Sequence, residues 1–491
     1  MFQQIRRLLK HSAVYGMGHI LTRMVSFILL PYLTHALNPE EYGAVTLLYT
    51  FIALALVLYA YGFDVTFLRY YILENDNQQR KKIFSTIFWS ATITSTLFSI
   101  IIAFSAAWLV SLVFENPESL GISSSYLILL SGALLFVETL GIYPYLWLRA
   151  VEKSLPFMAL KTTGVAINIG LAILLISVFD RGIAGVIEAN FIAASLQLLF
   201  LLPSILKNLT FSIQFDKLKE YLTFGFPNVP SQLFVMVIEL ANRKILEVIL
   251  GLSIVGIFSV GYKLGLFMAV VTMGFRFAWQ PFFLSIADTE EAKQTFSRVF
   301  TYFCLVTCSI FLLLVFTIKP IMTTSWPVVG ILINPDYWEG LNVFPIILLA
   351  HICNGAYANF MVGVYLKKKT GLMPIATGIA AAINIGGNIL LIPIYGMMAA
   401  AWMTLISYFS LAVLLYFLIR PYYRVDYEWK RVLLIAICTA VIYAVSMLPF
   451  FQTFWLLKLI LIPLFLTMLW LLRFFLPEEI SAVTRRLSPT K

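Results

Sequence analysis

Charged side chains are scarce in this chain. Asp, Glu, Lys and Arg make up 12% of the 491 residues, whereas 61% are hydrophobic; an ordinary soluble domain has about 25% charged and 45 to 50% apolar residues. This composition excludes a soluble globular protein. A membrane-spanning helix needs about 20 apolar residues, and fourteen such stretches follow one another along the chain. We therefore predict an all-α polytopic membrane protein with fourteen spanning helices.

The predicted spans start near Val14, Val45, Ile83, Leu120, Phe157, Ile183, Phe224, Val255, Ser297, Leu341, Leu372, Met397, Val432 and Thr453.

Cysteine and histidine are also rare, with four of each. The cysteines all fall within predicted spans, without the spacing of a disulfide framework or a zinc site. The sequence has no phosphate-binding glycine-rich loop, no H-E-x-x-H motif and no nucleophile elbow. We therefore expect a protein that is not an enzyme and that has no cofactor and no metal. His351 lies mid-span and is kept as a candidate, although a histidine satisfied within the core is the commoner case.

Positive charge exceeds negative charge, with a net charge of +10. Such an excess of positive charge can indicate a protein that binds nucleic acid, but here the positive charges follow the predicted membrane topology. If both termini are cytoplasmic, 26 of the 34 Lys and Arg fall in cytoplasmic segments, six fall within spans, and only Arg181 and Lys319 lie outside. This asymmetry predicts cytoplasmic termini. We expect a multi-pass protein of the bacterial inner membrane and no nucleic-acid partner.

One pentapeptide, Ala-Ile-Asn-Ile-Gly, occurs at residues 166–170 and again at residues 382–386, an offset of 216. Neighbouring segments align as well: "YGAVTL" from Tyr42 faces "VGIFSV" from Val255, and "KKIFSTIF" from Lys81 faces "KQTFSRVF" from Lys293. Internal repeats of this length in an apolar chain are typical of secondary transporters. Because each repeat has six spans, both repeats enter the membrane from the same side.

The repeat predicts the domain boundaries. We expect an N-lobe over residues 1–206, with an interfacial helix and helices 1 to 6, and a C-lobe over residues 224–419, with helices 7 to 12. We predict that residues 207–223 form an amphipathic linker on the cytoplasmic surface. Residues 420–491 hold helices 13 and 14 and a cytoplasmic tail. The sequence therefore predicts two parallel six-helix repeats and two additional C-terminal helices.

Charged residues inside predicted spans are the candidate functional residues, because each costs about 2.5 to 3.5 kcal/mol at the membrane centre. Four cations are candidate substrate-binding residues: Arg23, Arg243, Lys263 and Arg276. The candidates for ion coupling or charge balance are Asp64, Glu138, Glu188, Glu239, Glu247 and His351. Two more embedded cations carry weaker expectations, since Lys458 is near enough to a helix end to snorkel and Lys244 adjoins Arg243.

Several interpretations remain open for these charges. Glu239, Arg243 and Glu247 are spaced by four residues, so they can form a self-neutralised stripe on one helix face or a cavity wall that offers Arg243 to an anion. Arg276 can be an interfacial anchor, and Arg23 can pair with Asp64. Cations spread over depth suit a substrate with a phosphate head, which Arg binds well.

Four segments resemble bacterial polysaccharide-export flippases of the Wzx type, in the multidrug/oligosaccharidyl-lipid/polysaccharide exporter superfamily. They are "RMVSFILLPYLTHALNPEEYGAVTL" from Arg23, "ANRKILEVILGLSIVGIFSVGYKL" from Ala241, "FAWQPFF" from Phe277 and "INPDYWEGLNVFPIILLA" from Ile333. Many relatives have Asp before the helix-7 arginine, whereas this chain has Asn242.

The resemblance implies a V-shaped, two-lobed transporter that moves undecaprenyl-pyrophosphate-linked oligosaccharide, such as an O-antigen, capsule or exopolysaccharide repeat unit, to the periplasmic leaflet by alternating access. It places the cavity-arginine roles of related flippases on Arg23 and Arg276. The implied partners are the lipid-linked glycan, the bilayer, and the glycan polymerase and glycosyltransferases of the same pathway; we expect a monomer.

Two other functions are weighed against this one. A cation-coupled multidrug exporter would share the repeat but needs cavity acids, whereas the first helix has Arg23 and no acid. A membrane enzyme of glycan assembly, such as a polymerase or ligase, would need larger external loops than this chain has.

Overall fold

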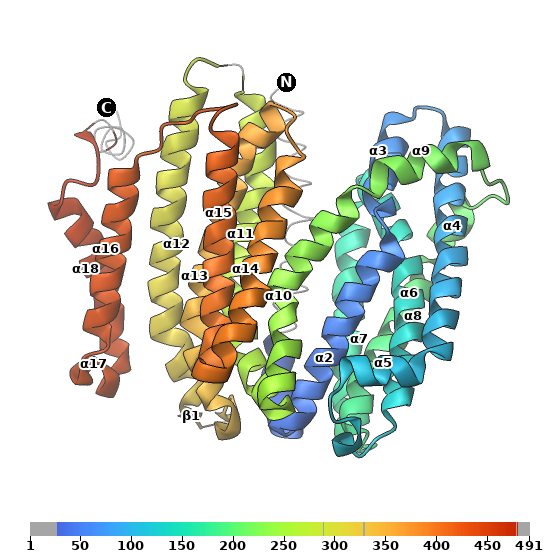
Figure 1. Ribbon diagram of the computed structural model, residues 1–491, viewed down its shortest axis with the longest axis horizontal. Helices are drawn as coiled ribbons and strands as arrows, with labels where there is room; N and C mark the ends of the chain where they lie inside the picture. The colour runs from blue at the N-terminus through green and yellow to red at the C-terminus, as the bar shows by residue number, and fades with distance from the viewer. Residues whose placement is uncertain (1–26, 288, 328, 478, 480–491) are drawn as a thin grey trace, which may run out of the picture.

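The computed structural model describes residues 27–287, 289–327, 329–477 and 479, and these form an almost entirely helical membrane protein (Figure 1). Eleven of the described helices are long and apolar enough to cross a membrane. The other three predicted spans correspond to the helix Phe27–Ala36, to the charge-bearing α10 and to the interrupted C-terminal segment. The all-α polytopic class is thereby confirmed.

The helices of the first half are α2 (Pro39–Ala60), α3 (Phe63–Leu73), α4 (Asn77–Phe104), α5 (Ala106–Val113), η1 (Pro117–Leu120), α6 (Ser124–Ala150), α7 (Ser154–Ser177) and α8 (Gly182–Asn208), followed by the surface helix α9 (Phe215–Gly225). Those of the second half are α10 (Asn228–Leu250), α11 (Leu252–Ser285), α12 (Ala292–Thr323), η2 (Pro335–Asn342), α13 (Phe344–Leu366), α14 (Leu372–Tyr395) and α15 (Met397–Ile419). The last described helices are α16 (Trp429–Ser446), α17 (Pro449–Thr453), η3 (Trp455–Ile460) and α18 (Leu461–Leu471).

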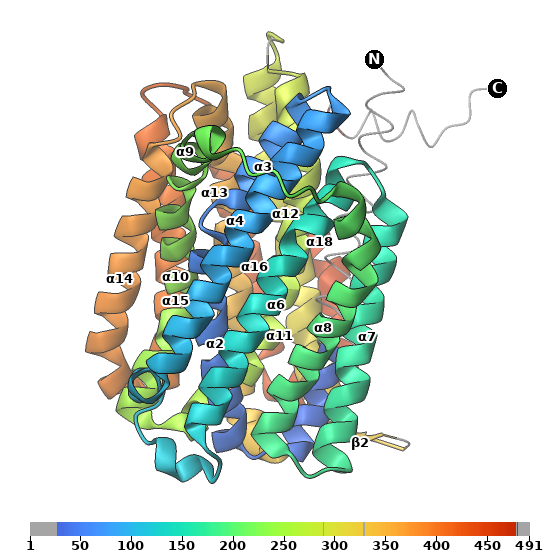
Figure 2. The same cartoon turned by 90° about the vertical axis from the view of Figure 1, so that its right-hand side faces the viewer.

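The helices gather into two lobes that meet at one end of the molecule and diverge towards the other (Figure 1). We call these ends the β1 end and the α9 end. Helices α2 to α8 form the N-lobe, helices α10 to α15 form the C-lobe, and α9 lies across the α9 end of the N-lobe (Figure 2). The only strands among the described residues, β1 (Ser325–Trp326) and β2 (Gly330–Ile331), make a small hairpin in the connection after α12.

The entry into α2 shows how local sequence fixes a helix start. Asn38 accepts a hydrogen bond from the Glu41 N–H, and the Glu41 carboxylate accepts one from the Asn38 N–H. This capping box satisfies backbone donors that the first turn leaves unpaired, and Pro39 occupies the first helical position, where no N–H is needed.

The second predicted span is broken between α2 and α3. Tyr61 and Gly62 have φ of 31° and 83°, which is a left-handed turn that glycine adopts without steric cost. A β-carbon at Gly62 would lie 2.2 Å from the Gly225 carbonyl oxygen, so α9 packs directly against this turn. The Thr66 hydroxyl also donates to the Tyr221 carbonyl at 3.0 Å. The surface helix is therefore fastened to the N-lobe.

The two lobes cross at a pair of equivalent glycines. A β-carbon on Gly43 of α2 would lie 2.1 Å from the Leu252 carbonyl oxygen, and one on Gly256 of α11 would lie 2.0 Å from that of Pro39. Gly43 and Gly256 are 213 residues apart, and so are Pro39 and Leu252. The contact is reciprocal, as a two-fold arrangement requires. The sequence repeat therefore corresponds to a pseudo-twofold relation between the lobes.

Polar contacts also join the lobes at the β1 end. The Tyr337 hydroxyl donates to the Leu37 carbonyl at 2.8 Å across 300 residues of sequence. The Glu115 N–H donates to the Glu247 carboxylate at 2.7 Å. These bonds hold the lobes together on the side where they converge.

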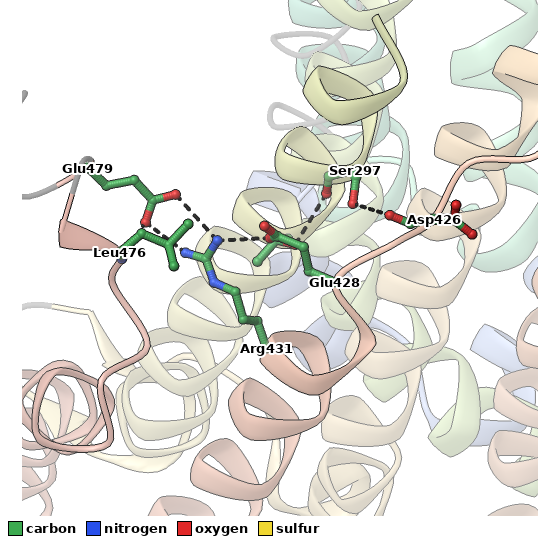
Figure 3. Close-up of polar contacts among 7 residues, drawn as sticks. Ser297, Asp426, Glu428, Arg431, Leu476 and Glu479 are labelled. Carbon is green, nitrogen blue, oxygen red and sulfur yellow. Dashed lines mark hydrogen bonds and ion pairs between the residues drawn. The ribbon is translucent and has the colours of Figure 1, made fainter. Parts of the chain in front are cut away.

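The C-terminal helices are attached to α12 by a polar cluster at the α9 end (Figure 3). Arg431 pairs with Glu428 at 2.8 Å and with Glu479 at 2.9 Å. The Ser297 hydroxyl donates to the Asp426 carbonyl at 2.9 Å. Partial burial raises the pKa of Glu479, but the Leu476 N–H and the Arg431 guanidinium lower it more, so the pKa lies below its ordinary value. This cluster fixes the two ends of the α16–α18 segment to the C-lobe.

Candidate functional site

A cavity of about 200 Å³ lies between the lobes. One wall comes from α2, with Tyr42 and Tyr49 among its residues, and the facing wall comes from α10 and α11. The facing wall supplies two cations, Arg243 and Lys263, and none of the described residues that line the cavity is an Asp or Glu. The electrostatic character of this cavity therefore favours an anion.

Arg243 lies on α10 and is 6% exposed. Its guanidinium stacks over the ring of Tyr262 at 4.4 Å, donates to the backbone carbonyl of Glu239, and donates to the Asn242 side chain at 3.4 Å. Within the described part of the chain, no carboxylate forms an ion pair with it. Because these hydrogen-bond partners and the aromatic face are neutral, the guanidinium keeps its charge available for an incoming anion.

The two glutamates spaced around Arg243 are engaged elsewhere. Glu239 accepts a hydrogen bond from the Tyr408 hydroxyl at 2.8 Å. Glu247 pairs with Lys244 at 2.6 Å, besides accepting the Glu115 N–H. Lys244 also donates to the Val113 carbonyl at 3.2 Å. The described residues therefore show no ion-paired stripe of Glu239, Arg243 and Glu247, because Glu247 pairs with Lys244 on the same helix and both of these residues also bind the N-lobe.

Lys263 follows Tyr262 on α11 and is half-buried at the cavity wall. Arg243 stacks on Tyr262, the residue before Lys263, and both cations line the same cavity. The structure thus brings together two of the four cations that the sequence singles out, on the wall formed by the C-lobe.

Arg276 lies farther along α11, thirteen residues towards the α9 end, which is about 20 Å along a helix axis. Its guanidinium donates to the backbone carbonyl of Asn354 at 2.8 Å and to its side-chain oxygen at 2.7 Å. It does not line the cavity of Arg243 and Lys263. The fourth cation, Arg23, lies outside the described residues, and with it the pairing of Arg23 with Asp64.

The remaining candidates lie around the site rather than in it. Asp64 begins α3 just after the Tyr61–Gly62 turn. His351 on α13 is 1% exposed, and its ring lies 6.5 Å from Tyr262 and 5.7 Å from Tyr408. It packs behind the aromatic residues that hold Arg243 and Glu239. Its placement is that of a core histidine supporting the wall of the cavity.

Glu188 belongs to the β1 end of the N-lobe. It forms an ion pair with Arg181 and accepts a hydrogen bond from the Tyr126 hydroxyl at 2.7 Å. The pair lies at the start of α8, and neither residue lines the cavity of Arg243 and Lys263. The sequence placed Glu188 inside a span without revealing this partner.

Glu138 lines a separate pocket of about 430 Å³ inside the N-lobe, between α6, α7 and α8. Lys161 and Gln197 line the same pocket, and the Lys161 ammonium lies 4.0 Å from the centre of the Tyr145 ring. Lys161 was not among the embedded cations predicted from the sequence. Lys161 lies seven residues after Ser154, the first residue of α7. This depth within a predicted span is the sequence feature that indicates an embedded cation.

The asparagines of the repeated pentapeptide stabilise their own lobes. The Asn168 amide donates to Asn190 at 3.2 Å, and the Asn384 amide donates to the Ser407 hydroxyl at 3.2 Å. Each bond joins the fifth helix of a lobe to its sixth. These residues therefore hold the scaffold around the cavity.

Comparisons with known proteins agree with this architecture. A family model described as polysaccharide biosynthesis protein matches residues 8–287. No curated protein matches the chain.

Solved structures share the fold. The lipid II flippase MurJ in an inward closed conformation aligns with a TM-score of 0.72 at 15% identity, over 93% of this chain and 98% of that chain. An inward-facing MATE multidrug resistance transporter aligns with a TM-score of 0.62 at 14% identity, over 84% and 94% of the two chains. A Vibrio cholerae MATE transporter gives 0.61 at 15% identity, over 85% and 96%.

Proposed function

Because the chain belongs to the polysaccharide biosynthesis protein family, within the multidrug/oligosaccharidyl-lipid/polysaccharide exporter superfamily, we propose that it is a flippase for undecaprenyl-pyrophosphate-linked oligosaccharide. The substrate is an O-antigen, capsule or exopolysaccharide repeat unit, and it moves from the cytoplasmic to the periplasmic leaflet by alternating access of the two lobes. The observation that carries the proposal is the cavity between the lobes, with Arg243 and Lys263 on its wall and no carboxylate among its described lining residues.

The cations supply a path for a phosphate head. The guanidinium of Arg243 offers paired donors that match phosphate oxygens, and Lys263 adds a second charge beside it. Arg276 offers a further contact nearer the α9 end, towards which the lobes diverge (Figure 1). The apolar carrier stays in the lipid while its charged head passes between the lobes.

The basic residues support a cytoplasmic α9 end. Residues 80–82 lie in the first turns of α4, residues 367–369 follow α13, and Arg420 and Arg424 follow α15 at that end. By the positive-inside rule, this distribution supports a cytoplasmic α9 end, which is the end towards which the lobes diverge. An anionic head moving outward gains about 2.3 kcal/mol per charge per 100 mV of membrane potential, which favours export.

The proposal is tested by replacing Arg243 and Lys263 with Gln, singly and together. Each variant is expressed in a host strain from which the gene for this protein has been deleted. Loss of a charge-assisted hydrogen bond costs about 1.5 to 3 kcal/mol, so surface glycan should fall at least roughly tenfold for each. Lys217→Gln, in an exposed ion pair on α9, is the matched control and should export normally. Membrane-fraction immunoblots establish that every variant is present.

Two outcomes would redirect the assignment. Normal glycan export by the Arg243→Gln, Lys263→Gln double variant would show that the cations do not handle the substrate. A multidrug resistance phenotype that is unaffected by these substitutions would instead favour the exporter of organic cations, for which a cavity without carboxylates is a poor binding site.

A further inference from the structure

A third pocket, of about 510 Å³, opens at the β1 end between the C-lobe and the C-terminal helices. Its walls are the last turns of α12, the start of α13, the end of α16 and the segment from α17 into η3, and η3 packs against α12. None of the residues used in the proposed flippase function lines it. The pocket is therefore a site separate from the cavity between the lobes.

Two lysines converge on this pocket from different elements. Lys458 of η3 is 8% exposed and donates to the Gln452 side-chain oxygen at 3.3 Å. Lys319 of α12 stands at the more exposed rim and donates to the Asn342 side-chain oxygen at 3.0 Å. Instead of extending into solvent, as its place near a helix end predicts, Lys458 is held inside the protein.

No acid balances these two charges. The described residues lining the pocket include no Asp or Glu, and neither ammonium group forms an ion pair within the described ranges. The amide oxygens of Gln452 and Asn342 satisfy one donor on each lysine, and an ammonium has three. A buried charge is retained at low cost only when an opposite charge meets it. Two like charges facing one pocket therefore form a site for a doubly or singly charged anion.

The surroundings indicate that this anion belongs to a lipid. Met447, which lines the pocket, and the adjoining Leu448 and Leu456 are 47%, 52% and 60% exposed, which fits a surface that faces acyl chains. Trp455 and Tyr443 line the pocket itself, and such aromatic residues are typical of the level of lipid headgroups. The site thus combines a cationic interior with an apolar approach from the membrane.

We propose that this pocket binds the phosphate of a membrane lipid headgroup in the leaflet at the β1 end, with Lys319 and Lys458 as its ligands. The same chemistry is carried by an anionic phospholipid such as phosphatidylglycerol and by a polyprenyl pyrophosphate carrier. Binding there ties α16, α17 and η3 to the ends of α12 and α13, at the opposite end of the C-terminal segment from the Arg431 cluster.

The test measures lipid binding to the purified full-length protein in a neutral detergent. The probes are phosphatidylglycerol, phosphatidylcholine, farnesyl pyrophosphate and inorganic phosphate, with the shift in melting temperature and native mass spectrometry as readouts. Lys319→Gln and Lys458→Gln should each raise the phosphatidylglycerol concentration for half-maximal shift by about fivefold, as expected for one lysine near a lipid phosphate. Lys293→Gln, an exposed cation at the other end of α12, is the control and should leave that concentration unchanged.

Comparing the probes identifies which kind of lipid supplies the phosphate. Tighter binding of farnesyl pyrophosphate than of phosphatidylglycerol assigns the site to the isoprenoid carrier, and the reverse order assigns it to bulk phospholipid. The proposal is overturned if both variants bind as the original protein does, if phosphatidylcholine binds equally well, or if inorganic phosphate alone gives the full shift. Lys319→Gln changes an exposed side chain, so the test holds even where Lys458→Gln does not fold. Glycan export is not a readout, so failure here leaves the proposed flippase function standing.

Discussion

The two lobes present equivalent positions to the same cavity, but with different charge. Tyr49 of α2 and Tyr262 of α11 are 213 residues apart, as are the next residues, Thr50 and Lys263, and all four line the cavity. The aromatic position is kept, while a hydroxyl on the N-lobe faces an ammonium on the C-lobe. The duplication therefore supplies a common wall, and the cations of the C-lobe distinguish what that wall can bind.

The same contrast extends along the helices towards the α9 end. Gly62 and Phe63 follow α2 in the N-lobe, and Gly274 and Phe275 lie at the equivalent place in α11. The residue after each pair is Asp64 in one lobe and Arg276 in the other. The N-lobe breaks its helix at this point, whereas α11 continues. The two halves have thus diverged in charge and in helix continuity around a shared framework.

The glycine crossing offers the largest test of that framework. Gly43→Ala and Gly256→Ala should each abolish export and lower the melting temperature, because the added methyl would lie 2.1 and 2.0 Å from a backbone carbonyl oxygen. Overpacking of this kind typically costs about 1 to 3 kcal/mol. The measurement is surface glycan together with a thermal melt of the purified protein.

The pentapeptide provides the matched glycines. A β-carbon at Gly170 or Gly386 meets no atom within 4 Å outside its own helix turn, so Gly170→Ala and Gly386→Ala should keep export and stability. Unequal effects of Gly43→Ala and Gly256→Ala would contradict a reciprocal crossing.

A charge exchange across the pseudo-twofold axis gives the next largest effect. Lys263→Thr should reduce export about tenfold, since it removes one charge-assisted contact to the substrate. Adding Thr50→Lys returns a cation to the same cavity from the other lobe and should recover much of the lost export. Transport of the lipid-linked substrate into the outer leaflet of proteoliposomes measures both.

The outcome of the exchange separates two explanations. Recovery would mean that the charge of the cavity selects the substrate, whichever lobe carries it. If Thr50→Lys, Lys263→Thr exports no better than Lys263→Thr alone, the ammonium is needed specifically beside Tyr262 and Arg243. Thr50→Gln, Lys263→Thr, which adds length without charge, is the control.

The helical framework is predictable from the sequence because its signals are local. Apolar runs located the spans, and the duplicated Asn168 and Asn384 located the repeat. The partners that the charged residues find in other elements are not predictable in this way. Helix spacing describes neighbours on one helix only, such as the Lys244–Glu247 pair, whereas the N–H of Glu115 approaches Glu247 from the other lobe. Which way a helix face points, and what approaches it, depends on packing between elements far apart in sequence.

The smallest expected effect concerns a serine that both lobes keep. Ser85 of α4 and Ser297 of α12 are 212 residues apart, and each holds the segment that leaves its lobe after the sixth helix. The Thr210 N–H donates to the Ser85 hydroxyl oxygen at 2.7 Å, and the Thr210 hydroxyl lies 3.0 Å from it. Ser297 has the single bond to the Asp426 carbonyl, beside the Arg431 cluster (Figure 3).

Ser85→Ala should therefore lower the free energy of unfolding by about 1 to 3 kcal/mol, because it leaves the Thr210 N–H unsatisfied. Ser297→Ala should cost about 1 kcal/mol or less, since a carbonyl oxygen is left without one donor while Arg431 still holds Glu428 and Glu479. Thermal melts compare the pair, with Ser309→Ala, whose hydroxyl bonds only within α12 among the described residues, as the control. A larger loss from Ser297→Ala would contradict this order. It would mean that the repeated serine matters more for attaching the C-terminal helices than for attaching the linker to the N-lobe.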